Sequence, residues 1–114
     1  MIQTRTLGTM TILELHGALN AGGADSGLRT AVRLALDGGA LAVILNLQDV
    51  AAVDSSGIAQ LASAHMTTAN HGGRVKLCCL SRKLKDVFII TRLNTVFDAY
   101  DTEADAIASA NARM

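Results

Sequence analysis

The chain has 114 residues, half of them apolar, and its 10 basic and 10 acidic side chains give a formal net charge of zero. This length holds one domain with a single hydrophobic core. The neutral balance argues against a protein whose main partner is nucleic acid or an anionic membrane surface, because both require an excess of positive charge.

Two short strands are predicted at the N-terminus, over residues 2–7 and 11–16, joined around Gly8 and Thr9. Both stretches are rich in β-branched residues and alternate in polarity, which is typical of a hairpin with one solvated face. His16 has no second metal-binding side chain near it in sequence, so we interpret it as a surface or edge residue.

The first helix is predicted after a loose stretch with glycines, with Asp25 or Ser26 as its N-cap and residues 38–39, both glycine, as its C-terminal stop. Arg29 and Arg33 share one side of this helix. The apolar residues recur at the spacing of one buried helix face on the opposite side. They are Leu28, Ala31, Val32, Ala35 and Leu36.

Residues 41–47 are predicted to form a central parallel strand, because this stretch is apolar on both faces apart from Asn46. A second helix is predicted from Ser56 onward. Its apolar stripe is expected to contain Ile58, Leu61, Ala62, His65, Met66 and Ala69. Residues 55–73 contain no charged side chain. This helix therefore either presents a neutral surface suited to docking or is more buried than an ordinary surface helix.

The C-terminal third is predicted to contain a strand over residues 75–80 and a helix that is capped by Ser81 and runs to about Arg92. A short strand over residues 96–100 and a terminal helix starting at Thr102 follow. Strands that alternate with helices through short links predict an α/β layer architecture.

The two cysteines, Cys78 and Cys79, are adjacent. Neighbouring residues of a strand point to opposite faces, so a disulfide between them would be strained. We expect buried or half-buried thiols, and no metal-binding partner occurs at ligand spacing.

No membrane segment is expected. The N-terminal sequence MIQTRTLGTM lacks the apolar core of a signal peptide. The uncharged run 55–73 has the length of a membrane span, but its many Ser, Gln, Thr, Asn and His residues are costly in lipid. We therefore expect a cytoplasmic protein without direct membrane insertion.

The tetrapeptide from Asp54 to Gly57, Asp-Ser-Ser-Gly, falls between the apolar strand and the second helix, where free backbone N–H groups collect. A catalytic serine elbow is disfavoured, because neither Ser55 nor Ser56 has glycine both two residues before it and two after it. A phosphoserine would be electrostatically favourable at a helix N-terminus. Simple capping by Asp54 or Ser55, worth about 1 kcal/mol, explains the same residues.

The run LNLQDVAAVDSSGIAQL, the upstream Gly17-Ala18-Leu19-Asn20 and the downstream HGGRVKLCCL resemble the STAS domains of bacterial anti-sigma factor antagonists. The similarity covers nearly the whole chain. It implies a single STAS domain over residues 1–114, with an α/β fold in which a small mixed β-sheet is flanked by about four helices.

The resemblance also implies a mechanism. In that family the serine directly after the aspartate is phosphorylated by a partner that is both a serine kinase and an anti-sigma factor. By position this serine is Ser55, with Ser56 as the less favoured acceptor. The unphosphorylated protein captures the kinase and frees a sigma factor. Phosphorylation ends the capture, and a PP2C-type, metal-dependent phosphatase restores it.

The implied partner-binding residues are Asn20, Asp54, Ser55, Ser56, Gly57 and Gln60. We expect no enzymatic activity, no cofactor, no metal and no nucleic-acid partner. Three positions depart from the family pattern: Asn20 stands where Asp is more frequent, Arg82 replaces a frequent Pro, and Arg92 replaces a small residue, usually Gly. The alternative function is that of a STAS scaffold or regulatory subunit, in a stress-signalling assembly or a membrane transporter complex.

Overall fold

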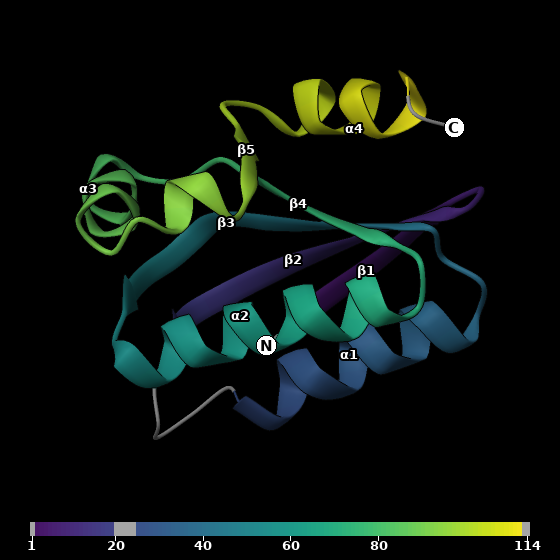
Figure 1. Ribbon diagram of the computed structural model, residues 1–114, viewed down its shortest axis with the longest axis horizontal. Helices are drawn as coiled ribbons and strands as arrows, with labels where there is room; N and C mark the ends of the chain where they lie inside the picture. Colours follow the sequence, from purple (N-terminus) through teal and green to yellow (C-terminus); the bar gives the residue numbers. More distant parts are fainter. Residues whose placement is uncertain (1, 20–24, 113–114) are drawn as a thin grey trace.

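The computed structural model describes residues 2–19 and 25–112, which form a five-stranded sheet with helices on both faces (Figure 1). The elements are β1 (Ile2–Leu7), β2 (Met10–Leu19), α1 (Asp25–Asp37), β3 (Ala42–Val53), α2 (Ser55–Asn70), β4 (Arg74–Cys78), α3 (Arg82–Ile90), the 3-10 helix η1 (Leu93–Thr95), β5 (Asp98–Tyr100) and α4 (Glu103–Ala112). The strands follow their sequence order across the sheet; β1 is antiparallel to β2 and the other neighbours are parallel. The predicted mixed α/β fold with four helices is confirmed.

Two apolar clusters lie on opposite faces of the sheet. Successive strand residues point to opposite sides, so Leu45 and Leu77 join a cluster with α1, α2 and α3, while Ile44 and Cys78 join a cluster with α4. Every residue from 42 to 47 is buried. The expectation of a central strand covered on both faces is therefore confirmed, and β3 has parallel neighbours on both sides.

The helix signals in the sequence are mostly confirmed. In α1, Leu28, Val32 and Leu36 are buried, as the apolar spacing predicted. Ser81 Oγ accepts a hydrogen bond from the Leu84 N–H (3.2 Å) and caps α3. Thr102 Oγ1 accepts one from the Asp105 N–H (3.1 Å) at the start of α4. These caps satisfy N–H groups that have no partner within a helix.

The predicted apolar stripe of α2 was partly wrong. Met66 is 64% exposed and Ala69 is exposed, whereas Thr68 is fully buried. The buried residues are Gly57, Leu61, Ala64 and Thr68. Thr68 packs closely on Gly73, where an added Cβ would lie 3.0 Å from Thr68 Cγ2. The absence of a side chain at Gly73 permits this close approach of Thr68.

Further details differ from the prediction. β4 ends at Cys78 rather than at residue 80, and β5 begins at Asp98 rather than at residue 96. β2 extends to Leu19 and β3 to Val53, because the two strands continue pairing beyond an irregularity at Glu14–His16. β1 is exposed along residues 3–7, as an edge strand, so it does not have the single solvated face that its alternation predicted. The helix expected to reach Arg92 ends at Ile90, and Arg92 adopts a left-handed conformation (φ 61°) before η1.

The cysteines are free thiols, as predicted, with Cys78 buried and Cys79 half-buried. Burial raises the pKa of the Cys78 thiol well above its usual value, and contact with Cys79 raises it further. Cys78 therefore stays protonated and packs as a small apolar residue beneath α4.

Candidate functional site

Asp54 is the N-cap of α2. Its backbone is extended (φ −98°, ψ −173°), and its Oδ1 accepts a hydrogen bond from the Gly57 N–H at 2.9 Å. The Asp54 carbonyl oxygen accepts the Ile58 N–H at 3.0 Å and starts the helical ladder. Of the two capping residues that the sequence left open, the structure selects Asp54, and Ser55 is the first helical residue.

The two serines of this first turn differ in accessibility. Ser55 is exposed, Ser56 is half-buried and Gly57 is buried. Because Asp54 caps the helix, the Ser55 hydroxyl is not required for capping. It stands on the surface at the positive end of the helix dipole, where an added anion is electrostatically favoured.

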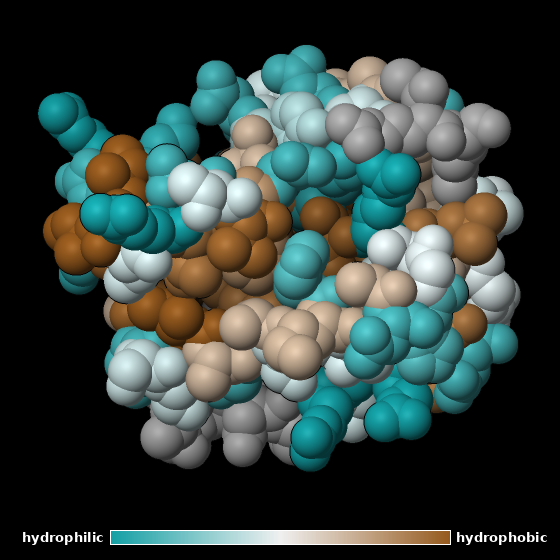
Figure 2. Space-filling model, in the orientation of Figure 1, coloured by the Kyte–Doolittle hydropathy of each residue, from teal (hydrophilic) through white to brown (hydrophobic). Residues whose placement is uncertain are grey.

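The exposed side of α2 behind Ser55 is neutral. Its exposed residues are Ser55, Ala59, Ser63, Met66, Ala69 and Asn70. In Figure 2 the helix crosses the view as a mostly pale band, flanked by the more hydrophilic surface of α1 below it. Of the two readings of this uncharged helix, the structure supports a neutral surface, because the helix exposes one side as an ordinary surface helix does.

Exposed apolar side chains lie next to this neutral surface. The ring of His65 in α2 contacts the ring of Phe97 (centroids 5.3 Å apart), and Phe97 in turn contacts Phe88 of α3 (6.0 Å). Ile90 is 81% exposed, and Ile89 and Val96 are also exposed. Figure 2 shows hydrophobic surface, in brown, over α3 and η1 at its left. This combination of neutral and apolar surface is typical of a protein interface.

Gln60 lies one turn after Ser56, and both line a groove between α2 and α1. The predicted residues Asp54, Ser55, Ser56 and Gly57 thus occupy one helical turn, with Gln60 in the next. Asn20 lies outside the described residues. Sequence reasoning missed that Arg29 and Arg33 line the same groove. The helical spacing placed them on the polar side of α1 but carried no signal that α2 lies alongside.

The histidine rings are engaged away from Ser55. His16 Nδ1 lies 3.0 Å from Asp49 Oδ2, His65 contacts Phe97, and His71 Nδ1 lies 2.9 Å from the Thr67 carbonyl oxygen. Within the described ranges, no group of three or more His, Cys, Asp or Glu residues is placed to hold a metal ion.

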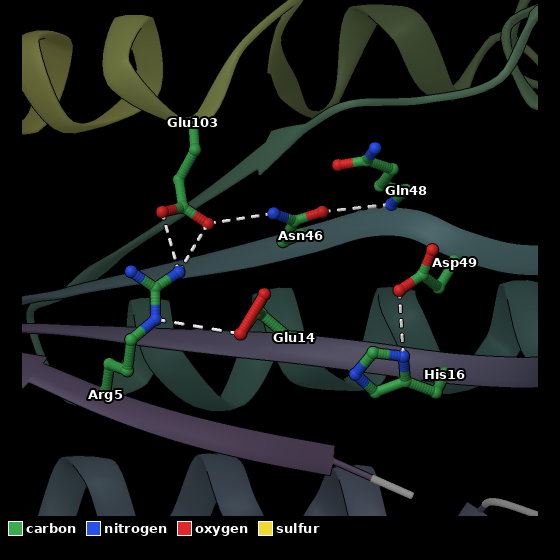
Figure 3. A network of polar contacts seen from close by, with 7 residues as sticks. All are labelled: Arg5, Glu14, His16, Asn46, Gln48, Asp49 and Glu103. Atoms are coloured by element: carbon green, nitrogen blue, oxygen red, sulfur yellow. Dashed lines mark hydrogen bonds and ion pairs between the residues drawn. The ribbon is translucent and has the colours of Figure 1, made fainter.

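A second polar cluster lies on the α4 side of the sheet (Figure 3). Arg5 Nη2 of β1 donates to both carboxylate oxygens of Glu103 in α4 (2.6 and 2.7 Å), and Asn46 Nδ2 of β3 donates to Glu103 Oε2 (2.8 Å). Arg5 Nε lies 3.7 Å from Glu14 Oε2 of β2. The hydrogen bond from Arg5 lowers the pKa of Glu103. One cation thus pairs with two carboxylates, and the cluster connects α4 to β1, β2 and β3.

The fold is that of a small α/β domain whose most distinctive surface feature is an exposed serine at a capped helix N-terminus. The profile of the STAS domain family matches residues 1–106. The chain therefore belongs to the STAS domain family.

Solved structures share this fold. TM1081 from Thermotoga maritima, provisionally described as an anti-sigma factor antagonist, is 22% identical, with a TM-score of 0.88 over 96% of this chain and 94% of that one. The phosphorylated form of SpoIIAA from Bacillus is 22% identical (TM-score 0.72, 96% and 98% covered). A sulfate transporter family protein from Wolinella succinogenes is 17% identical (TM-score 0.82, 94% and 88% covered).

The search of curated protein sequences found no match. In the described part of the chain, no helix combines the length and the apolar character needed to cross a membrane.

Proposed function

We propose that the protein is an anti-sigma factor antagonist. In its unphosphorylated form it binds an anti-sigma factor that is also a serine kinase, and a sigma factor is released. Phosphorylation of Ser55 ends this binding, and a PP2C-type phosphatase restores it. The observation that carries the proposal is that Ser55 is exposed and directly follows Asp54, the residue that caps α2. Membership of the STAS family and likeness to SpoIIAA, an anti-sigma factor antagonist, support it.

The switch follows from electrostatics. A phosphoserine adds about two negative charges and prefers the N-terminus of a helix, so the protein itself tolerates it. The surrounding surface of α2 carries no charged residue from 55 to 73. A partner that fits this neutral surface would have to bury the phosphate without matching cations, which costs several kcal/mol and is enough to end binding.

Ser55 is favoured over Ser56 as the acceptor. A kinase must reach the hydroxyl with its own catalytic groups, and Ser55 is exposed whereas Ser56 is half-buried at the edge of the groove. In this proposal the protein acts in the cytoplasm by binding alone, without enzymatic activity or a cofactor, and Asp54, Gly57 and Gln60 contribute to recognition around Ser55.

The test is to incubate the protein with ATP and purified candidate anti-sigma kinases from its own genome, and to map any phosphate by mass spectrometry. We expect one phosphate on Ser55. Ser55→Ala should remove it, and Ser55→Asp should abolish the kinase complex in a pull-down. Thr6→Ala, which removes an exposed hydroxyl from the edge strand β1, is the control and should behave as the wild type.

Two results would contradict the proposal: phosphate that maps outside residues 55 and 56, or a Ser55→Asp variant that binds the kinase as tightly as the wild type. Urea denaturation accompanies both assays, so that lost binding is not confused with lost folding.

A regulatory subunit of a membrane transporter complex or of a stress-signalling assembly is the second candidate. The observation in its favour is the fold similarity to the sulfate transporter family protein from Wolinella succinogenes. A subunit of this kind would co-purify with a transporter or with large particles, and Ser55→Asp would leave that association unchanged.

A further inference from the structure

The groove between α1 and α2 combines an apolar floor with polar walls. Its volume is about 510 Å³, which accommodates a few side chains of a partner. Leu28, Val32 and Ala64 form the buried floor. One wall is made by Arg29, Thr30 and Arg33 of α1, and the other by Ser56, Ala59, Gln60, Ser63 and Thr67 of α2.

The two arginines give the groove its charge. Both are exposed, and each directly follows a floor residue, Leu28 or Val32, so they stand along one edge. They are four residues apart on a helix, which places them about 5–6 Å apart at Cβ. Among the side chains that the structure describes, no carboxylate forms an ion pair with either arginine, and this includes Asp37, one turn beyond Arg33.

The facing wall adds no negative charge. Residues 55–73 contain neither acidic nor basic side chains, and the α2 wall presents hydroxyl and amide groups instead. The groove is thus a positively charged strip on a protein whose formal net charge is zero. A charged strip of this kind steers and orients a partner of opposite charge.

We propose that this groove binds an acidic helical segment of the partner protein, with two carboxylates one helical turn apart that pair with Arg29 and Arg33. Arginine suits this role because its planar guanidinium pairs with a carboxylate through two hydrogen bonds. Hydroxyl and amide groups of α2, from Ser63 and Gln60, face the polar flank of the same segment. The identity of the partner as an anti-sigma kinase rests on the proposed function; the acidic character of the segment does not.

The position of the groove links it to the phosphorylation site. Ser56 lines the groove and Ser55 precedes it in the chain. A phosphate on Ser55 would therefore bring negative charge to the end of the groove at which a carboxylate-bearing segment would lie. Repulsion between the phosphate and those carboxylates weakens binding in addition to the cost of burying the phosphate.

The first arm of the test uses no kinase. The ¹⁵N-labelled protein is titrated with an alanine-based helical peptide that has glutamates at i and i+4, with its glutamine counterpart, and with an eight-nucleotide oligothymidine. We expect saturable amide shifts at residues 28–33 and 56–67 with the glutamate peptide alone, weakening between 50 and 300 mM salt because exposed charges are screened. R29E/R33E should weaken this binding at least about tenfold. R82E/K83E, the matched reversal of two exposed cations on α3, should not.

The second arm uses the kinase that phosphorylates Ser55. R29E/R33E should weaken the complex at least about tenfold. R29Q/R33Q, which removes the charge without reversing it, should have a smaller effect in the same direction. Circular dichroism checks that both variants fold. Full kinase affinity in R29E/R33E would overturn the inference, and so would equal shifts with the glutamine peptide or the oligonucleotide.

Failure of the inference and failure of the proposed function give different results. If no kinase modifies Ser55 but the glutamate peptide still binds the groove, the proposed function fails and the groove remains an acid-binding site. If Ser55 is phosphorylated but R29E/R33E binds the kinase normally, the groove inference fails and the proposed function stands.

Discussion

The Oδ1 atom of Asp54 lies 2.9 Å from the backbone nitrogen of Gly57. This hydrogen bond caps α2, and the neighbouring Ser55 is exposed. The residue that holds the turn and the residue proposed as phosphate acceptor are therefore separate, and mutations should separate their effects.

Asp54→Ala should lower the free energy of unfolding by about 1 kcal/mol, because it leaves the Gly57 N–H without its cap. Ser55→Ala should change it by less than about 0.5 kcal/mol, since it removes only an exposed hydroxyl. Urea denaturation measures both. Equal destabilisation by the two variants would show that Ser55 shares the capping role.

The ion pair between Arg5 and Glu103 should make stability sensitive to acid. The pKa of Glu103 is lowered in the folded state, chiefly by the hydrogen bond from Arg5. The folded state therefore favours the carboxylate, and this stabilisation is complete above the pKa of the unfolded chain and is lost as the pH falls through the lower pKa of the folded state.

Glu103→Gln should accordingly cost at most about 1 kcal/mol at pH 7, because the pair is partly exposed. The difference in unfolding free energy between wild type and variant should shrink as the pH falls below 4.5, the ordinary pKa of a glutamate. Urea denaturation from pH 7 to pH 3 measures it. Arg5→Gln should reduce the acid sensitivity in the same way, and a difference that is constant with pH would refute this account.

Two lysine–aspartate pairs differ in burial, so removal of their aspartates should lower the free energy of unfolding by different amounts. Lys76 is fully buried, and its Nζ lies 2.9 Å from Asp98 Oδ2. Lys85 and Asp101 are both exposed, and Lys85 Nζ lies 3.1 Å from Asp101 Oδ1. Asp98→Ala should destabilise the protein by about 2 kcal/mol, because it leaves the buried ammonium group of Lys76 without its carboxylate partner. Asp101→Ala should cost less than about 1 kcal/mol. Chemical denaturation compares the two.

Lys76→Met supplies the control for this pair. It replaces the buried charge with an apolar side chain of similar length, so we expect stability close to that of the wild type. In the Lys76→Met background, Asp98→Ala should lose most of its effect. An undiminished effect there would mean that Asp98 stabilises the sheet edge without acting through Lys76.

Arg92 adopts the left-handed conformation with φ 61° and ψ 17°. A residue with a side chain pays roughly 1 kcal/mol there, and glycine does not. Arg92→Gly should therefore raise the free energy of unfolding by about 0.5 kcal/mol, after the greater flexibility of glycine in the unfolded chain is included. Arg92→Ala keeps the strain and should be no more stable than the wild type. Thermal unfolding ranks the stability of the three proteins. Equal stability of Arg92→Ala and Arg92→Gly would contradict the explanation.

Much of the fold follows from local signals. The caps Ser81 and Thr102, the buried face of α1 and the central position of residues 42–47 were all predicted correctly. These features depend on residues that are three or four positions apart in a helix, or two positions apart in a strand. A short window of sequence therefore contains the information that specifies them. The motif at residues 54–57 was located in the same way.

Tertiary packing decided three features that local signals did not predict. These are the alignment of α1 with α2, the exposure of Met66, and the contact of Arg5 with Glu103 across 98 residues. The sequence located residues 54–57 at the start of α2, although it predicted the helix from Ser56 rather than Ser55, and it determined that the flank of the helix is uncharged. Only the folded chain determined that Asp54 rather than Ser55 caps the helix and that two arginines of α1 line a groove beside it. Helical periodicity is set by hydrogen bonds between near neighbours, whereas the pairing of helices depends on close packing between side chains far apart in the chain.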